Sequence, residues 1–355
     1  MKGYGMTKVE QAGWLEVERP KAGPLDALVR PTLIAPCTSD THVLHGGFGP
    51  DVKNLILGHE AVGEVVEVGN LVKNFKPGDV VVVPCCNPDF LNKEVQGVGW
   101  ANAHDNGKRF FSSFKFLAQK HGVWGEVFHV NQADANLVIL PKGVTQEQAV
   151  MTVDMMSTGF HGVENAEIGY GDTVLVMGIG PVGLMCVAGA KLKGAGRILA
   201  TGTRENCIAI AKEYGATDII NYKKGDIVEQ VKDLVKGEVD RVIIAGGGQE
   251  TLLQALKVVK AGGVVSNVNF FDGKDTFTIP AGEWGLGMGN ITIRGGFCPG
   301  GAKRIEKLLE IVKYRVDTSK LITHRFEGFD KIEEAFILMG KKPADLIKPV
   351  VSIKW

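Results

Sequence analysis

The segment Thr173–Gly183, TVLVMGIGPVG, decides the fold of this 355-residue chain. Its first five residues form an uninterrupted apolar run, which is typical of a buried β-strand. The run leads into Gly178-Ile179-Gly180-Pro181-Val182-Gly183, which matches G-x-G-x-x-G. Glycines at this spacing allow a tight turn and let backbone N–H groups approach a pyrophosphate at a helix N-terminus. The segment therefore predicts a dinucleotide-binding strand, turn and helix.

The same region could be mistaken for a membrane span, because Thr173–Ala190 holds eighteen residues without a charge. Four glycines and a proline interrupt it, so a buried strand followed by a buried helix explains it better. The chain also begins without the apolar core of a signal peptide. Its formal net charge of zero provides no electrostatic footprint for nucleic acid or an anionic membrane. We expect neither as a partner.

Strands and helices alternate on the C-terminal side of the turn, which predicts a doubly wound α/β domain with a parallel sheet. The predicted elements are strands at 173–177, 198–201, 218–221, 241–245, 263–267 and 291–294, and helices at 181–193, 207–214 and 227–235. Residues before about 155 are instead β-rich, with short apolar runs at Ala61–Val68 and Val80–Val83. Residues 87–124 form an irregular excursion, and the last 55 residues add a helix at 303–313 and a strand at 347–353.

The six cysteines are scattered, and only Cys85 and Cys86 are adjacent. This is not the pattern of a disulfide framework, so we expect a reducing, cytoplasmic environment.

The end of the second predicted strand, Thr201-Gly202-Thr203-Arg204-Glu205, selects the cofactor. Enzymes that use NAD usually place an acid here to bind the ribose 2′-hydroxyl. Gly202 occupies that position and leaves room for the 2′-phosphate of NADP, with which Arg204 can pair. The sequence favours NADP, unless a longer strand makes Glu205 the ribose acid.

Three distant residues offer the donors of a catalytic zinc site: Cys37, His59 and Asp154. Their spacing proves nothing by itself, because single buried cysteines and histidines are usually structural.

Four segments together resemble the zinc-containing medium-chain dehydrogenases, in particular the microbial tetrameric NADP(H)-dependent secondary alcohol dehydrogenases. They are PCTSD (36–40), GHEAVGEVVEVG (58–69), VDMMSTGFHG (153–162) and GIGPVG (178–183). The resemblance implies a GroES-like catalytic domain over 1–157, a Rossmann NADP-binding domain over 158–297 and a return to the catalytic domain over 298–355. It further implies a homotetramer that interconverts small secondary alcohols and ketones.

The resemblance also implies roles for single residues. Cys37, His59 and Asp154 bind one zinc per chain, and Glu60 is a neighbour that can enter as a ligand. Ser39 bonds the substrate oxygen, and His42 lies at the outer end of the proton relay. The 2′-phosphate pocket is formed by Gly202, Thr203, Arg204 and Tyr222. The substrate pocket is lined by Cys85, Phe114, Phe270, Phe297 and Cys298.

Two departures put the substrate in doubt: the stretch 85–121 is divergent, and phenylalanines stand at 114 and 270, where relatives often have Trp and Tyr. Within the zinc enzymes, polyol, butanediol and threonine dehydrogenases remain alternatives. A zinc-free quinone or enone reductase would share the fold and the cofactor turn. A non-enzymatic NADPH-binding protein would need neither the ligand set nor the Ser39–His42 relay.

Overall fold

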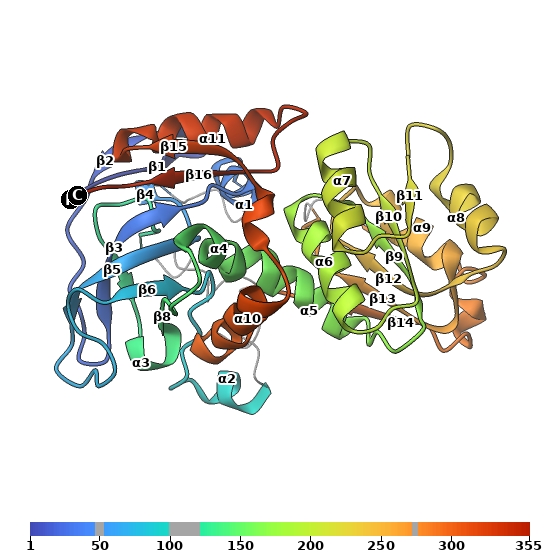
Figure 1. Cartoon of the computed structure of the whole chain (residues 1–355), viewed down its shortest axis with the longest axis horizontal. Helices are drawn as coiled ribbons and strands as arrows, with labels where there is room; N and C mark the ends of the chain where they lie inside the picture. Colours follow the sequence, from blue (N-terminus) through green and yellow to red (C-terminus); the bar gives the residue numbers. More distant parts are fainter. Residues whose placement is uncertain (47–52, 99–120, 272–275) are drawn as a thin grey trace. The chain divides into compact units, whose positions relative to one another are not determined.

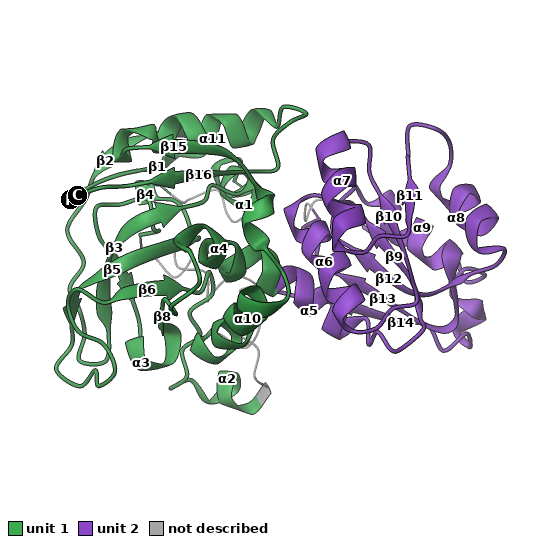
Figure 2. Ribbon diagram, viewed as in Figure 1, with its two compact units in different colours: residues 1–157, 298–355 green, residues 158–297 purple. Residues whose placement is uncertain are grey.

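The computed structural model describes residues 1–46, 53–98, 121–271 and 276–355 (Figure 1). The chain divides into two compact units (Figure 2). Unit 1 comprises Met1–Ser157 and Cys298–Trp355, and unit 2 comprises Thr158–Phe297. The chain thus leaves its first unit once and returns to it.

Unit 2 is built on a parallel sheet with the strand order β11-β10-β9-β12-β13-β14. The strands are β9 (Thr173–Met177), β10 (Arg197–Thr201), β11 (Asp218–Ile220), β12 (Val239–Ile244), β13 (Val259–Asn267) and β14 (Thr292–Gly295). The helices are α5 (Ser157–Asn165), α6 (Pro181–Leu192), α7 (Glu205–Tyr214), α8 (Ile227–Val235) and α9 (Glu250–Val258), with the 3₁₀ turn η3 (Gly285–Gly287). Figure 1 shows α6 and α7 on one face of the sheet and α8 and α9 on the other. This arrangement confirms the predicted doubly wound fold.

The glycine motif forms the turn between β9 and α6. Gly178 has φ +89°, and a Cβ at Gly183 would lie 1.8 Å from the carbonyl oxygen of Gly178. Only glycine fits such a close approach of helix to strand. The uncharged stretch is therefore a strand and a twelve-residue helix. Among the described residues, no helix has the length and apolar character to cross a membrane.

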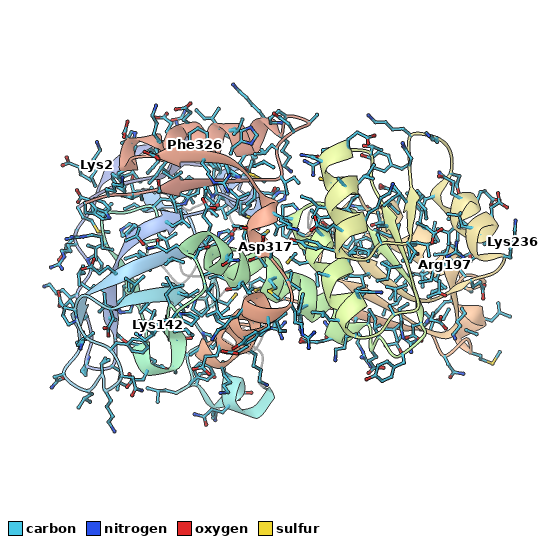
Figure 3. All side chains as sticks on the ribbon, viewed as in Figure 1. Lys2, Lys142, Arg197, Lys236, Asp317 and Phe326 are labelled. Atoms are coloured by element: carbon cyan, nitrogen blue, oxygen red, sulfur yellow. The ribbon has the colours of Figure 1, made fainter. Side chains whose placement is uncertain are left out.

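A bidentate ion pair joins β10 to β11. Arg197, labelled in Figure 3, donates from Nε and Nη2 to the two carboxylate oxygens of Asp218, each over 2.8 Å. The guanidinium holds the pKa of Asp218 below its ordinary value. The pair therefore adds a side-chain link to the backbone pairing of these two strands.

Unit 1 contains two sheets. The smaller has the order β2-β1-β4, and the larger β15-β16-β3-β5-β6-β8, with β7 paired to β3. Their bounds are β1 (Lys2–Lys8), β2 (Gln11–Glu16), β3 (Ala27–Ile34), β4 (Leu55–Ile56), β5 (Ala61–Val68), β6 (Val80–Val83), β7 (Phe128–Val130), β8 (Val138–Ile139), β15 (Ile322–Glu327) and β16 (Lys348–Ser352). The last strand, β16, pairs antiparallel with β3. The C-terminal segment of the chain therefore completes a sheet that the N-terminal segment begins.

The helices of unit 1 are mostly short. They are α1 (Thr38–Leu44), α2 (Lys93–Val98), α3 (Ala133–Asn136), α4 (Gln146–Met151), α10 (Ala302–Tyr314) and α11 (Ile332–Lys341), with 3₁₀ turns η4 (Thr318–Leu321) and η5 (Phe329–Lys331). Between α4 and α5 the chain forms a π-helix, η2 (Thr152–Met156). Such π turns are rare and occur frequently at functional sites.

Candidate metal centre and cofactor pocket

Three separate elements of unit 1 deliver a cluster of metal-binding side chains. Cys37 is the N-cap of α1, directly after β3. His59 and Glu60 precede β5, and Asp154 lies inside the π-helix η2. Because β3 and β5 are paired neighbours, the end of β3 and the start of β5 meet at one place.

The donor atoms of Cys37, His59, Glu60 and Asp154 all lie within 4.8 Å of one another, and all four residues are buried. Oδ2 of Asp154 is 3.7 Å from Sγ of Cys37 and 3.4 Å from Nε2 of His59. Oε2 of Glu60 is buried without a hydrogen-bond partner among the described residues. Thiolate, imidazole and carboxylate are donors that zinc accepts, so these residues fit a catalytic zinc ion.

Asp40 orients the histidine of this cluster. Its Oδ1 lies 3.0 Å from Nδ1 of His59, and its Oδ2 accepts the backbone N–H of Cys37 over 2.9 Å. Burial alone would lower the pKa of His59, but the carboxylates of Asp40 and Asp154 raise it well above its ordinary value. Surroundings this negative favour a cation, and a carboxylate behind a ligating imidazole is a common outer-shell partner. The sequence did not predict this role.

Lys348 supplies a buried positive charge beside the cluster. Its Nζ donates to Oε1 of Glu60 over 2.5 Å, and both side chains are completely buried. Burial raises the pKa of Glu60 to about 7, although Lys348 opposes that shift. This residue was also missed from the sequence. The signal was available, because a lysine inside the predicted closing strand, Ile347–Ile353, needs a buried partner.

The proposed proton-relay residues lie on α1, next to the cluster. Oγ of Ser39 is 3.7 Å from Sγ of Cys37. His42 follows three residues later, so the two side chains share one face of the helix. Both are partly exposed, whereas Cys37 is buried.

The residues predicted to line a substrate pocket are only partly brought together. Cys85 and Cys298 touch, with their sulfur atoms 3.3 Å apart, and Sγ of Cys85 lies 3.9 Å from Oδ1 of Asp154. Phe270 and Phe297 belong to unit 2, and Phe114 lies outside the described residues. The lining remains a prediction.

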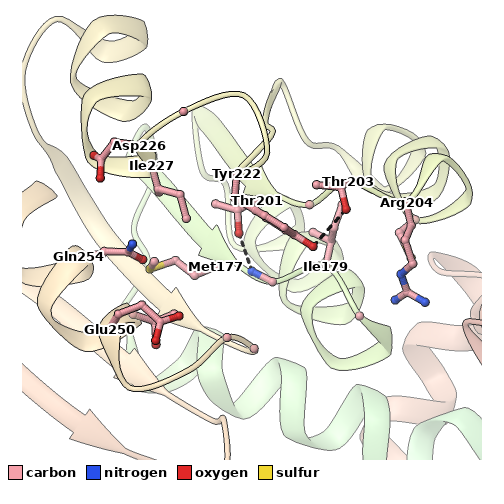
Figure 4. A pocket seen from close by; sticks show the side chains of 18 residues that line it. Met177, Ile179, Thr201, Thr203, Arg204, Tyr222, Asp226, Ile227, Glu250 and Gln254 are labelled. Atoms are coloured by element: carbon pink, nitrogen blue, oxygen red, sulfur yellow. Dashed lines mark hydrogen bonds between the residues drawn. The ribbon is translucent and has the colours of Figure 1, made fainter. Parts of the chain in front are cut away.

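The glycine turn of unit 2 opens onto a pocket of about 450 Å³ (Figure 4). It is lined by Gly178, Gly180, Gly202, Thr203, Arg204 and Tyr222. Two acidic residues that the sequence did not single out also line it: Asp226, the N-cap of α8, and Glu250, the first residue of α9. Thr203 Oγ1 donates to the hydroxyl of Tyr222 over 3.1 Å. Pro181 and Val182 start α6, with Pro181 in its first turn. The motif and the predicted phosphate residues therefore border one cavity.

Two details of this pocket bear on cofactor choice. A Cβ at Gly202 would lie 2.3 Å from the side chain of Ile179, so an acid there would clash with that side chain unless it moved. Glu205 is the first residue of α7, beyond the end of β10, and it does not line the pocket. The alternative in which Glu205 binds the ribose therefore has no support from the geometry.

Comparison with known proteins agrees with this arrangement. A family model described as "Alcohol dehydrogenase GroES-like domain" matches residues 23–142, and one described as "Zinc-binding dehydrogenase" matches residues 181–313. The NADP-dependent isopropanol dehydrogenase of Clostridium beijerinckii is 58% identical over 99% of this chain and 100% of its own. The enzyme of the same name from Thermoanaerobacter brockii is 55% identical over the same shares.

A solved structure extends the likeness to the fold. The alcohol dehydrogenase TADH from Thermus sp. ATN1 superposes with a TM-score of 0.82 at 28% identity, covering 100% of both chains. Fold, donor cluster and relatives thus agree along the length of the sequence, and the chain belongs to the zinc-binding, medium-chain alcohol dehydrogenase family.

Proposed function

We propose that this protein is a zinc- and NADP(H)-dependent dehydrogenase that interconverts small secondary alcohols and ketones. The observation that carries the proposal is the buried cluster of Cys37, His59, Glu60 and Asp154. The pocket at Gly202 and Arg204 supports NADP as the cofactor. Arg204 can pair with the 2′-phosphate, and Gly202 replaces the acid that would repel it. The isopropanol dehydrogenases, at 58% and 55% identity, support the substrate class.

In this proposal the chain's own residues hold the reactants and move the proton. When bound, zinc would supply a Lewis acid for the substrate oxygen, and NADP would supply a hydride acceptor. Ser39 accepts the hydroxyl proton and passes its own to His42, one helical turn away along α1. Asp40 keeps His59 in one orientation, and Lys348 holds Glu60 beside the ligands.

We also propose that the protein is a cytoplasmic homotetramer. Large apolar side chains are exposed near the edge strand β14 of unit 2, among them Trp284, Leu286 and Met288. An unpaired strand edge beside an apolar patch is a typical site of association. The free state of the six cysteines suits a reducing compartment.

The decisive experiment combines metal analysis with a substrate panel. Elemental analysis should find about one zinc per chain, the count of a single catalytic set, and Cys37→Ala should lose both zinc and activity. The panel compares kcat/KM for 2-propanol, 2-butanol, ethanol, sorbitol and threonine at fixed NADP. We expect the two secondary alcohols first, because each extra buried methylene contributes up to about 0.8 kcal/mol. Full activity in Cys37→Ala would refute the zinc assignment, and a preference for sorbitol or threonine would refute the substrate class.

A further inference from the structure

A second group of metal-binding side chains lies beside the zinc cluster. Two of its members, Cys85 and Cys298, are predicted to line the substrate pocket, but none of the three is predicted to bind a metal. Cys85 and Cys86 follow β6, and Cys298 lies at the point where the chain returns to unit 1. All three thiols are buried, with exposed fractions of 1%, 0% and 3%. None of them forms a disulfide. Three free thiols are therefore held together out of solvent.

The spacing of the three sulfur atoms matches a shared ion. The sulfur atom of Cys85 is 3.3 Å from that of Cys298 and 3.7 Å from that of Cys86, and all three lie within 4.8 Å of one another. A tetrahedral ion with thiolate bonds of about 2.3 Å places its sulfur ligands roughly 3.8 Å apart. Small side-chain adjustments would bring the three thiolates to these positions.

A fourth donor is already in place. Asp154 directs Oδ2 at Cys37 and His59, whereas Oδ1 lies 3.9 Å from Sγ of Cys85. One carboxylate thus borders both groups of ligands, with one oxygen on each side. A carboxylate in this position can bridge two ions or complete the coordination of either.

We propose that Cys85, Cys86 and Cys298 form a second metal site, specific for a soft thiophilic cation such as Cu⁺ or Cd²⁺, with Oδ1 of Asp154 as its fourth donor. Three S–H bonds give up protons to solvent as three metal–sulfur bonds form, and no electron is transferred. Sulfur donors select softer cations than a mixed set of sulfur, nitrogen and oxygen. The two neighbouring sites would therefore sort ions, with zinc at Cys37 and the softer cation at the three thiols.

The test uses zinc-loaded protein in a phosphine reductant and Cd²⁺ as the probe. Equilibrium dialysis with elemental analysis follows both metals, and ultraviolet thiolate-to-cadmium absorption follows the sulfur ligands. We expect one Cd²⁺ per chain with the zinc retained. Cys86→Ala should weaken cadmium binding by at least about tenfold, since even outer-shell changes at metal sites cost that much. Cys186→Ala, which removes a buried thiol of α6, is the matched control and should leave cadmium binding unchanged.

Two results would overturn the proposal. One is zinc release in equal amount as cadmium enters, which places cadmium at Cys37. The other is cadmium binding by Cys86→Ala that equals that of the original chain. If Cys86→Ala is too unstable to measure, Cys86→Ser, which preserves the side-chain size, replaces it. Cys86→Ser should show the same loss of cadmium binding. The experiment measures metal content and not enzyme activity. Its result can therefore be interpreted even if the protein proves not to be an alcohol dehydrogenase.

Discussion

Arg204 occupies the N-cap position of α7 and lines the cofactor pocket. We expect Arg204→Ala to weaken NADP binding about ten- to a hundredfold, because a charged hydrogen bond contributes roughly 1.5–3 kcal/mol. NAD binding should stay nearly unchanged, since NAD lacks the 2′-phosphate. Fluorescence titration with both cofactors measures the difference. The neighbouring Glu205→Ala, outside the pocket, is the control, and equal losses for both cofactors in Arg204→Ala would show that Arg204 does not contact the phosphate.

Lys348 and Glu60 form a buried pair whose halves depend on each other. Lys348→Met leaves the Glu60 carboxylate buried without its partner, and the expected loss of stability is about 3–5 kcal/mol. Differential scanning calorimetry should show a clear fall in Tm.

The double variant Lys348→Met with Glu60→Gln separates the pair from the packing around it. Removing both charges should recover most of the lost stability, because no unpaired ion is then buried. If the double variant were as unstable as Lys348→Met, the loss of stability would come from poor packing of the methionine and not from the unpaired charge of Glu60.

The residues of the metal site also show how much of it could be predicted from the sequence. It nominated Cys37, His59, Glu60 and Asp154 through short motifs, and the structure gathers them. It did not nominate Asp40 or Lys348, because their importance lies in the partner each meets. Lys348 meets Glu60 across 288 residues of sequence, a pairing that only the return of β16 to β3 creates.

At the scale of elements, local patterns located the six parallel strands of unit 2 but missed the strand β15 of unit 1 and several helical segments. The predicted helix Ile227–Val235 is present at the same residues, and β13 begins at Val259 rather than Gly263. Helix α9 was not predicted, although its apolar face packs on the core of unit 2. The π-helix η2 could not be foreseen, because it differs from an α-helix only in hydrogen-bond register.

The ion pair between β10 and β11 makes a prediction about pH. Arg197 holds the pKa of Asp218 below its ordinary value of 3.8, so the pair stabilises the folded state above that value. Its contribution is lost as pH falls through the lowered pKa. Asp218→Asn should therefore reduce Tm at pH 7, by the equivalent of about 1 kcal/mol for a partly exposed pair.

The difference in Tm between Asp218→Asn and the original chain should narrow as pH falls below 3.8. Melting curves from pH 7 to pH 3 provide the check. A difference that is constant over this range would mean that charge at Asp218 does not stabilise unit 2.

At the scale of the whole molecule, the proposed association of subunits can be tested at the exposed apolar residues near β14. Leu286 and Met288 are 70% and 76% exposed near β14. If this surface joins the subunits of the proposed tetramer, Leu286→Glu with Met288→Glu should give smaller species, because two charges would be buried without partners. Light scattering after size-exclusion chromatography measures the mass. Leu71→Glu, at a 55% exposed leucine of unit 1, is the control. A tetramer that survives the double substitution would exclude this surface.

The π-helix that carries Asp154 has a consequence for genetics. A π turn holds about one residue more than an α turn, and each helical residue rotates the chain by about 100°. Loss of the codon for Thr152 or Val153 would let the segment close as an uninterrupted α-helix. The carboxylate would then rotate out of line with Cys37 and His59, although every ligand would still be encoded. In-frame deletions at this point should therefore be as damaging as ligand substitutions, and a scan that only exchanges residues would never reveal it.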